Sequence, residues 1–161
     1  MRRLLIVLLA GLGLALAASS TQAAPPAAVA EEGSVHPVSG LEVIPVTITQ
    51  NGKTHRFHVE VARTPAEQAQ GLMFRTELGP QDGMIFPSAT PQFRSFWMRN
   101  TVIPLDLIFV GPDKRIINII ANAAPYSLDP LESAGPAIAV LELNGGRAAE
   151  LGLKPGSRVE W

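Results

Sequence analysis

The residues best suited to chemistry lie in the segment FWMRNTVIPLDLIFV, which runs from Phe96 to Val110. This segment is almost wholly apolar, yet it carries Arg99, Asn100 and Asp106. A carboxylate between two leucines is costly to bury unless an opposite charge or hydrogen bonds compensate for the lost water. We therefore predict that Asp106 lies inside the protein against an arginine, with Arg75 as the favoured partner.

These polar residues support two interpretations that can both hold. In the first, Asp106 stabilises the loop of residues 100–104, and its pairing with an arginine is structural. In the second, a flat aromatic ring, a forked donor and short polar acceptors line a pocket for a sugar or a small polar anion. The residues predicted to bind this ligand are Arg75, Trp97, Arg99, Asn100 and Asp106.

Two other chemistries remain open as alternatives. Asp106 and Glu142 lie in strands that could be neighbours, and a carboxyl pair would suit a hydrolase of envelope glycans; the simpler interpretation places Glu142 in solvent. Three thioethers that adjoin aromatic residues could bind Cu(I) in an exported protein, although such residues are ordinary core fillers. These are Met73, Met84 and Met98.

No sequence signature of a cofactor enzyme is present. The chain lacks a Gly-rich phosphate loop, an H-E-x-x-H motif and a G-x-S-x-G motif. It also lacks cysteine, which excludes a thiol nucleophile and a thiolate metal site. We therefore expect no cofactor and favour a non-enzymatic envelope domain that binds a small polar or saccharide ligand.

The N-terminus has the layout of a secretory signal peptide over residues 1–23. Arg2 and Arg3 precede an apolar run of 13 residues, 4–16, and small residues follow up to Ala23. This run is shorter than the ~20 residues that a membrane-spanning helix needs. We expect cleavage after Ala23, no integral membrane span in the mature chain, and a periplasmic or secreted protein.

The mature chain is expected to hold a disordered linker at residues 24–40 and a single β-rich domain at residues 41–161. The linker is rich in Pro, Ala and Gly and has no apolar period. The mature net charge of about −3 gives no electrostatic reason to expect a nucleic-acid partner. Nothing in the sequence predicts an oligomeric state.

Local patterns indicate a mainly β fold. Alternating residues 41–49 lead into Asn51-Gly52, which is the strongest short signal for a β-hairpin. The run Thr-Pro-Ala-Glu that starts at Thr64 is a capping box and predicts a short helix over Pro65–Gln70. Short apolar runs separated by turns follow, with one helical turn suggested at residues 147–151. The pattern predicts a small jelly-roll-like sandwich or barrel with one short helix after the first hairpin.

Five motifs occur in a characteristic order: GLMFR, GMIF, FWMRNTVIPLDLIFV, AVLELNGG and LGLKPGSRV. In this order they resemble the domain-of-unknown-function family 192, also called uncharacterised protein family 0127, over about residues 54–161. The combination of GLMFR with FWMRNTVIPLD carries the specificity of the resemblance. It implies a compact, mainly β, jelly-roll-like domain, and it implies no reaction.

Overall fold

The structure of the protein is a computed structural model that describes residues 34–161. The predicted signal peptide at residues 1–23 and the first part of the predicted linker lie outside the described residues. Within residues 34–161 the fold is mainly β, as predicted, and its large sheet does not close into a barrel. No helix in this part of the chain is long and apolar enough to cross a membrane.

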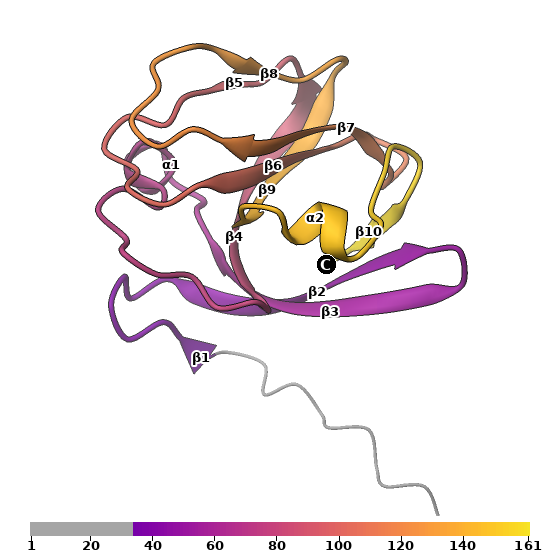
Figure 1. Ribbon diagram of the computed structural model, residues 1–161, viewed down its shortest axis with the longest axis horizontal. Helices are drawn as coiled ribbons and strands as arrows, with labels where there is room; N and C mark the ends of the chain where they lie inside the picture. Colours follow the sequence, from indigo (N-terminus) through magenta and orange to yellow (C-terminus); the bar gives the residue numbers. More distant parts are fainter. Residues whose placement is uncertain (1–33) are drawn as a thin grey trace, which may run out of the picture.

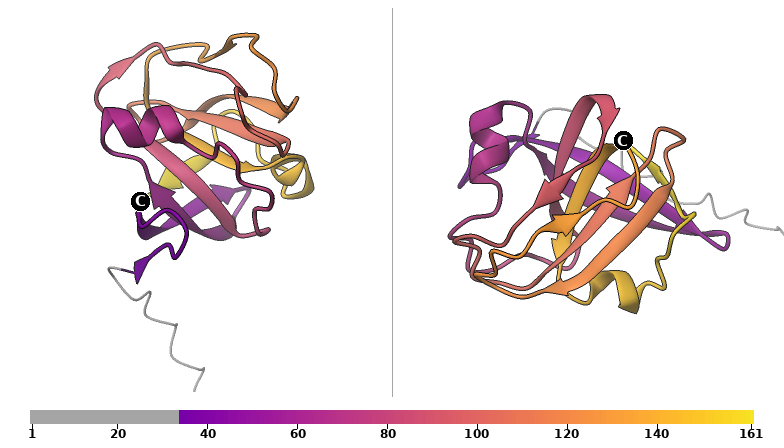
Figure 2. Two further views of the ribbon diagram at one scale, coloured as in Figure 1. Left: turned by 90° about the vertical axis from the view of Figure 1, so that its left-hand side faces the viewer. Right: turned by 90° about the horizontal axis from the view of Figure 1, so that it is seen from above.

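The described chain forms ten strands and two short helices (Figure 1). In order they are β1 (Ser34–Val35), β2 (Glu42–Gln50), β3 (Lys53–Val61), α1 (Pro65–Gln70), β4 (Asp82–Gln92), β5 (Ser95–Phe96), β6 (Leu105–Val110), β7 (Ile116–Ala123), β8 (Leu131–Glu132), β9 (Ala137–Asn144), α2 (Arg147–Glu150) and β10 (Arg158–Glu160). The two helices lie well apart in the views of Figures 1 and 2.

Eight of these strands form one strongly curved sheet in the order β1-β2-β3-β4-β9-β6-β7, with β10 also paired to β2. Strands β3 and β4 are parallel, and α1 lies in the connection between them. β10 also makes an isolated bridge from Arg158 to Arg115, just before β7. The two ends of the sheet therefore approach each other, while β5 and β8 form a separate pair.

The buried apolar residues form two clusters, one on each face of β4, β9 and β6. The inner cluster lies within the curve of the sheet and includes Val46, Ile48, Phe57, Val59, Ile85, Ile108, Leu141, Leu143 and Val159. The outer cluster lies on the opposite face and includes Leu72, Met84, Phe86, Met98, Leu105, Leu107, Phe109 and Val140. Strand β6 is buried at every residue because both of its faces are covered, which explains its nearly continuous apolar sequence.

The local predictions for the first hairpin and the first helix are confirmed. Asn51 and Gly52 have positive φ angles of 50° and 77°, as a tight hairpin turn requires. At α1 the Thr64 hydroxyl accepts from the Glu67 N–H at 3.2 Å, and the Glu67 carboxylate accepts from the Thr64 N–H at 2.8 Å. Hydrogen bonds from the backbone of Thr64, and then of Arg63, hold the pKa of Glu67 below its usual value.

The end of the predicted linker is ordered. Within residues 34–40, β1 pairs with the start of β2. His36 lies 3.7 Å from a Glu60 carboxylate oxygen, and the Ser39 hydroxyl donates to the other oxygen. The composition of this segment indicated disorder, but a distant carboxylate on β3 supplies the contacts that order it.

Candidate functional site

Asp106 is fully buried, as predicted, but its partners are backbone amides and not an arginine. The N–H of Asn122 donates to Oδ1 at 2.8 Å, and the N–H of Gly146 donates to the same oxygen at 2.9 Å. The N–H of Ala148 donates to Oδ2 at 2.7 Å. These three bonds join β6 to β7 and to the start of α2.

The start of α2 depends on this distant carboxyl group because its own N-cap residue, Gly146, has no side chain to accept from the helix N-terminus. A carboxylate near a helix N-terminus satisfies unpaired N–H groups and interacts favourably with the helix dipole. Asp106 therefore caps α2 from another strand. The predicted interpretation in which Asp106 stabilises the loop of residues 100–104 is wrong, because both oxygens are directed at β7 and α2.

The two glycines after β9 allow the backbone to approach Asp106. The Gly145 N–H donates to the Pro104 carbonyl at 2.9 Å, and a Cβ at Gly145 would lie 2.8 Å from the Pro104 Cβ. Gly146 has a φ of +85°, which side-chain-bearing residues rarely adopt. The motifs IPLD and LNGG, distant in sequence, thus form one structural unit.

The guanidinium of Arg75 pairs with Glu60, so the predicted pair of Arg75 with Asp106 is wrong. Arg75 lies 2.9 Å from one Glu60 oxygen and 3.1 Å from the other. Glu60 is 3% exposed and points to the outer face of the sheet, whereas Asp106 aligns with Leu143 of the inner face. The sheet itself separates Arg75 from Asp106.

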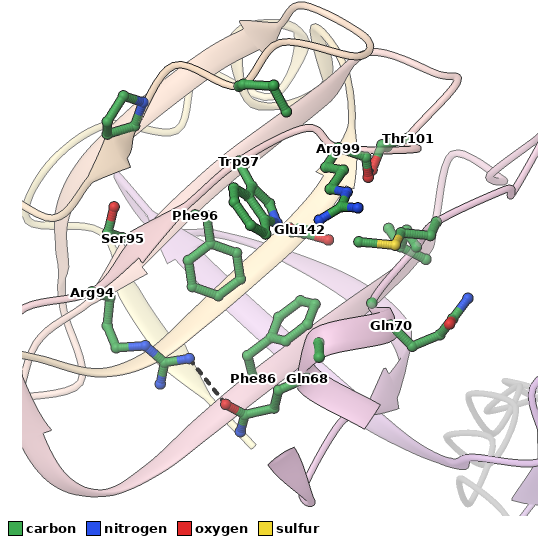
Figure 3. Close-up of a pocket in the computed structure, with 16 residues that line it drawn as sticks. Gln68, Gln70, Phe86, Arg94, Ser95, Phe96, Trp97, Arg99, Thr101 and Glu142 are labelled. Carbon is green, nitrogen blue, oxygen red and sulfur yellow. Dashed lines mark hydrogen bonds between the residues drawn. The ribbon is translucent and has the colours of Figure 1, made fainter. Parts of the chain in front are cut away.

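A cavity of about 500 Å³ opens on the outer face, between α1, the chain around β5 and the loop that leads to β8 (Figure 3). Its volume lies within the range of small-molecule sites. The residues with polar or aromatic side chains that line it are Gln68, Gln70, Phe86, Arg94, Ser95, Phe96, Trp97, Arg99, Thr101 and Glu142. We call this space the outer cavity.

Glu142 lines this cavity from the middle of β9. Its residue is 5% exposed, and its neighbours in the sheet register are Met84 on β4 and Leu107 on β6. Among residues 34–161 its carboxyl group has no hydrogen-bond or ion-pair partner. Burial raises the pKa of Glu142 to about 8, so the group is mostly a neutral carboxylic acid at pH 7.

Aromatic rings and arginines form the rest of the cavity wall. The Phe96 ring packs edge-on against Phe86, with the ring centroids 5.1 Å apart. The guanidinium of Arg99 lies 5.7 Å from the centre of the Trp97 ring, and that of Arg94 lies 5.3 Å from the centre of the Phe96 ring. Arg94 also donates to the Gln68 amide oxygen at 3.2 Å, as Figure 3 shows. Both arginines are therefore held beside aromatic faces.

Left-handed backbone occurs in three neighbouring loops near the cavity. Phe74, Asn100 and Tyr126 have φ angles of 63°, 55° and 63°. The Phe74 N–H donates to the Asn100 carbonyl at 2.8 Å, and the Tyr126 N–H donates to the Thr101 carbonyl at 3.1 Å. Bulky residues are unfavourable in this conformation. The Phe74 and Tyr126 side chains are also exposed, so burial in the core does not offset this cost. Strain of this kind is common where loops are shaped for binding.

The structure divides the predicted ligand-binding residues. Trp97 and Arg99 line the outer cavity together, although the strand ends at Phe96 and a turn follows in place of the extended chain we expected. Arg75 lines a second cavity of about 650 Å³ beside α1. Asn100 and Asp106 line neither of these two cavities. Trp97 and Arg99 are thus the predicted residues that share one cavity.

Several residues of the outer cavity were not in the predicted ligand set: Gln68, Arg94, Phe96, Thr101 and Glu142. Glu142 carried the same signal as Asp106, an acid inside an apolar strand, but we expected solvent around it. That expectation is wrong, because β9 is a central strand covered on both faces. The position of Arg94 had no comparable sequence signal.

The geometry also bears on the two alternative chemistries. Asp106 and Glu142 point to opposite faces of the sheet, so they cannot act on one bond. Met84 and Met98 are each 1% exposed in the outer cluster, while Met73 lines both cavities. In the described part of the chain no group of three His, Cys, Asp or Glu side chains could hold a metal ion.

Comparison with known proteins identifies the family. The model of the family DUF192, described as Uncharacterized ACR, matches residues 46–161. A solved protein of unknown function from Novosphingobium aromaticivorans DSM 12444 is 62% identical, with a TM-score of 0.80, and the match covers 83% of this chain and 94% of that one. A solved protein from Sinorhizobium meliloti 1021, called a "putative transcription regulator", is 39% identical with a TM-score of 0.72, covering 74% of this chain and 94% of that one. Among curated proteins, none matches.

Proposed function

This chain belongs to the DUF192 family, and we propose that it is a non-enzymatic binding domain whose outer cavity takes a small polar, saccharide-like ligand. The proposal rests mainly on Glu142. A buried carboxyl group without a partner lowers stability, and nearly all buried polar groups in folded proteins are satisfied. Glu142 has no partner from the described protein and borders the open cavity, so a ligand bound there would take the place of water as its hydrogen-bond partner.

The chemistry of the cavity wall supports a sugar. Trp97 is 51% exposed at the wall, so one part of its ring can stack on the C–H face of a pyranose. Gln68, Arg99 and Glu142 bring amide, guanidinium and carboxyl groups to the same cavity, and these can bond to ring hydroxyls. Apolar stacking with a few convergent polar groups is the usual composition of a small-molecule site.

A binding function also agrees better with the cavity than hydrolysis does. Glycosidases generally act with two carboxyl groups on either side of the scissile bond. Glu142 is the one Asp or Glu side chain among the described residues that line the outer cavity. A raised pKa suits a general acid, but a second catalytic carboxylate has no counterpart in this wall.

We further propose that the domain acts in the periplasm or outside the cell. This proposal is supported by the charged, apolar and small-residue order of residues 1–23. Mass spectrometry of the protein purified from its own host would test it, since export predicts a mature N-terminus at Ala24. An intact N-terminus in the cytoplasmic fraction would overturn it.

Thermal unfolding with a panel of monosaccharides and disaccharides would test the binding function. A ligand present at about ten times its Kd should raise Tm by about 5 °C. Trp97→Ala should abolish this rise, because it removes the stacking surface, while changing the Tm of the free protein little. Isothermal titration of the best sugar would give the affinity of each variant.

Phe93→Ala is the matched control. Phe93 is an exposed aromatic residue of the same segment, 71% exposed, and it does not line the outer cavity. This variant should bind the sugar as the unmodified protein does. A panel without any response, or equal loss of binding in both variants, would overturn the proposed site.

A further inference from the structure

The outer cavity carries a net positive charge at neutral pH. Its charged lining residues within the described chain are Arg94, Arg99 and Glu142. The two guanidinium groups supply positive charge, and burial keeps most of the Glu142 carboxyl neutral because its pKa is raised to about 8. Two cations thus face one neutral acid across a space large enough for a ligand.

The elements packed around Glu142 supply no charge that would change this balance. β4 and β6 place Met84 and Leu107 beside it, and α1 contributes the amides Gln68 and Gln70 to the cavity. The neighbouring titratable groups are occupied elsewhere or exposed: Glu60 is paired with Arg75, Glu67 caps α1, and Asp129 accepts from Ser127. Arg94 and Arg99 from the chain around β5 are the cations that face the cavity.

The two arginines differ in what they can still bind. Arg94 is half-buried and already donates to the Ser88 hydroxyl and the Gln68 amide oxygen. Arg99 is exposed, and no side-chain hydrogen bond occupies its guanidinium among residues 34–161. It lies over the Trp97 ring, which holds its planar fork beside the surface where a sugar would stack. A guanidinium fork of this kind binds carboxylates through two parallel hydrogen bonds.

Resting on the proposed function, we propose that the ligand is an acidic sugar of the uronic-acid type, whose carboxylate binds between Arg99 and the protonated carboxyl of Glu142 while its ring stacks on Trp97. Arg99 neutralises the charge of the ligand. Glu142 donates its proton as a short hydrogen bond to the ligand carboxylate, as a neutral acid can. This arrangement gives the Arg99 guanidinium and the Glu142 carboxyl group a common partner.

The arrangement makes binding depend on pH. An acidic sugar is ionised above about pH 4, so its charge is constant across the neutral range. When Glu142 loses its proton, two carboxylates face each other and the hydrogen-bond donor is gone. The affinity for an acidic sugar is then expected to fall about tenfold for each pH unit above 8. The affinity for a neutral sugar should change far less.

Isothermal titration with two matched sugar pairs, glucose with glucuronate and galactose with galacturonate, would test the proposal at pH 6.5, 8 and 9.5. Each pair differs in the group at C6. We expect at least tenfold tighter binding of one acid than of its neutral partner at pH 6.5, with the preference lost at pH 9.5. Glu142→Gln should remove most of the pH dependence, because an amide does not titrate in this range.

Arg99→Gln should abolish the preference for the acid while leaving weak binding of the neutral sugar. Arg56→Gln is the matched control, since Arg56 is an exposed arginine of β3 that does not line the cavity. Equal affinity for both members of each pair would overturn the acidic-sugar proposal and leave the binding function standing. A preference retained by Arg99→Gln would overturn the assigned residues, and no binding of any of the four sugars would count against both proposals.

Discussion

Two buried acids on opposite faces of the same strand pair have opposite surroundings. Asp106 on β6 aligns with Leu143, and Glu142 on β9 aligns with Leu107. Asp106 accepts three backbone N–H groups, whereas Glu142 has no partner within the described chain and borders a cavity. The difference indicates that Asp106 stabilises the fold, and it is the contrast on which the proposed binding role of Glu142 rests.

The comparison shows how the same sequence feature acquires two roles. Each acid interrupts an apolar strand that is covered on both faces, and each would be costly without compensation. On the inner face, the turn after β9 folds back and supplies N–H donors. On the outer face, the chain from α1 to β5 leaves open space beside Glu142. The outer cavity thus lies where the second layer of the fold leaves one of the two acids uncovered.

The largest expected effect is the loss of the Asp106 carboxyl group. Asp106→Ala leaves three buried N–H groups without an acceptor and should lower the free energy of unfolding by about 5 kcal/mol. Urea unfolding followed by circular dichroism would measure this loss. Asp129→Ala, in an exposed loop, should cost less than about 0.5 kcal/mol. A stable Asp106→Ala variant would remove the contrast between the two acids.

The next effect is a pH dependence that Glu142 imposes. Between pH 4.5 and about 8 the folded state binds more protons than the unfolded chain, because burial raises the Glu142 pKa. The free energy of unfolding should therefore fall as pH rises through this window. The loss should reach up to about 4 kcal/mol near pH 8, because solvent in the cavity reduces it below the value that the full pKa shift would give.

Glu142→Gln should remove this fall and be more stable than the unmodified protein at pH 8. Urea unfolding at pH 5, 6.5 and 8 would measure how the free energy of unfolding changes with pH in this variant and in the unmodified protein. Glu132→Gln, at an exposed position of β8, is the control. Equal slopes for Glu142→Gln and the unmodified protein would show that Glu142 titrates normally.

A third buried acid, Glu60, has neither the three backbone donors of Asp106 nor, within the described chain, the partnerless carboxyl group of Glu142. Its main partner is the guanidinium of Arg75. Arg75→Met leaves the buried Glu60 carboxylate without its guanidinium partner, with the Ser39 hydroxyl and His36 still beside it, and should cost about 3 kcal/mol. Arg63→Met, which breaks the exposed pair with Glu42, should cost less than about 0.5 kcal/mol. Chemical unfolding of both variants would measure the difference. The double variant Glu60→Gln, Arg75→Met should recover part of the loss, and no recovery would mean that Arg75 acts through packing alone.

Much of the fold was predictable from short stretches of sequence. The hairpin at Asn51-Gly52 and the capping box at Thr64 depend on residues within four positions of each other, so the sequence specifies them directly. Apolar alternation located the two strands of the first hairpin, and short apolar runs between turns indicated the later strands. The extent of β4 and the early end of β5 were not predictable, because partner strands decide where a ladder begins and ends.

The candidate site was predictable only in part. Trp97 and Arg99, predicted as a flat ring and a forked donor of one pocket, do line the same cavity. The partner of Arg75 was missed because Glu60 lies on a hairpin strand whose alternation pointed to solvent. The donors to Asp106 were missed because they are backbone groups up to 42 positions away, and backbone N–H groups leave no mark on a sequence.

By itself, the sequence determined where most strands, turns and the first helix form, that Asp106 lies inside the protein, and which family the chain belongs to. These features depend on local backbone preferences and on the order of motifs. The tertiary structure decided which acid is satisfied and which faces a cavity. The sequence could not show this difference, because it depends on the register of β6 against β9, which sends Asp106 to the inner face and Glu142 to the outer face. Segments distant in the sequence then cover the inner face completely and leave a cavity on the outer face.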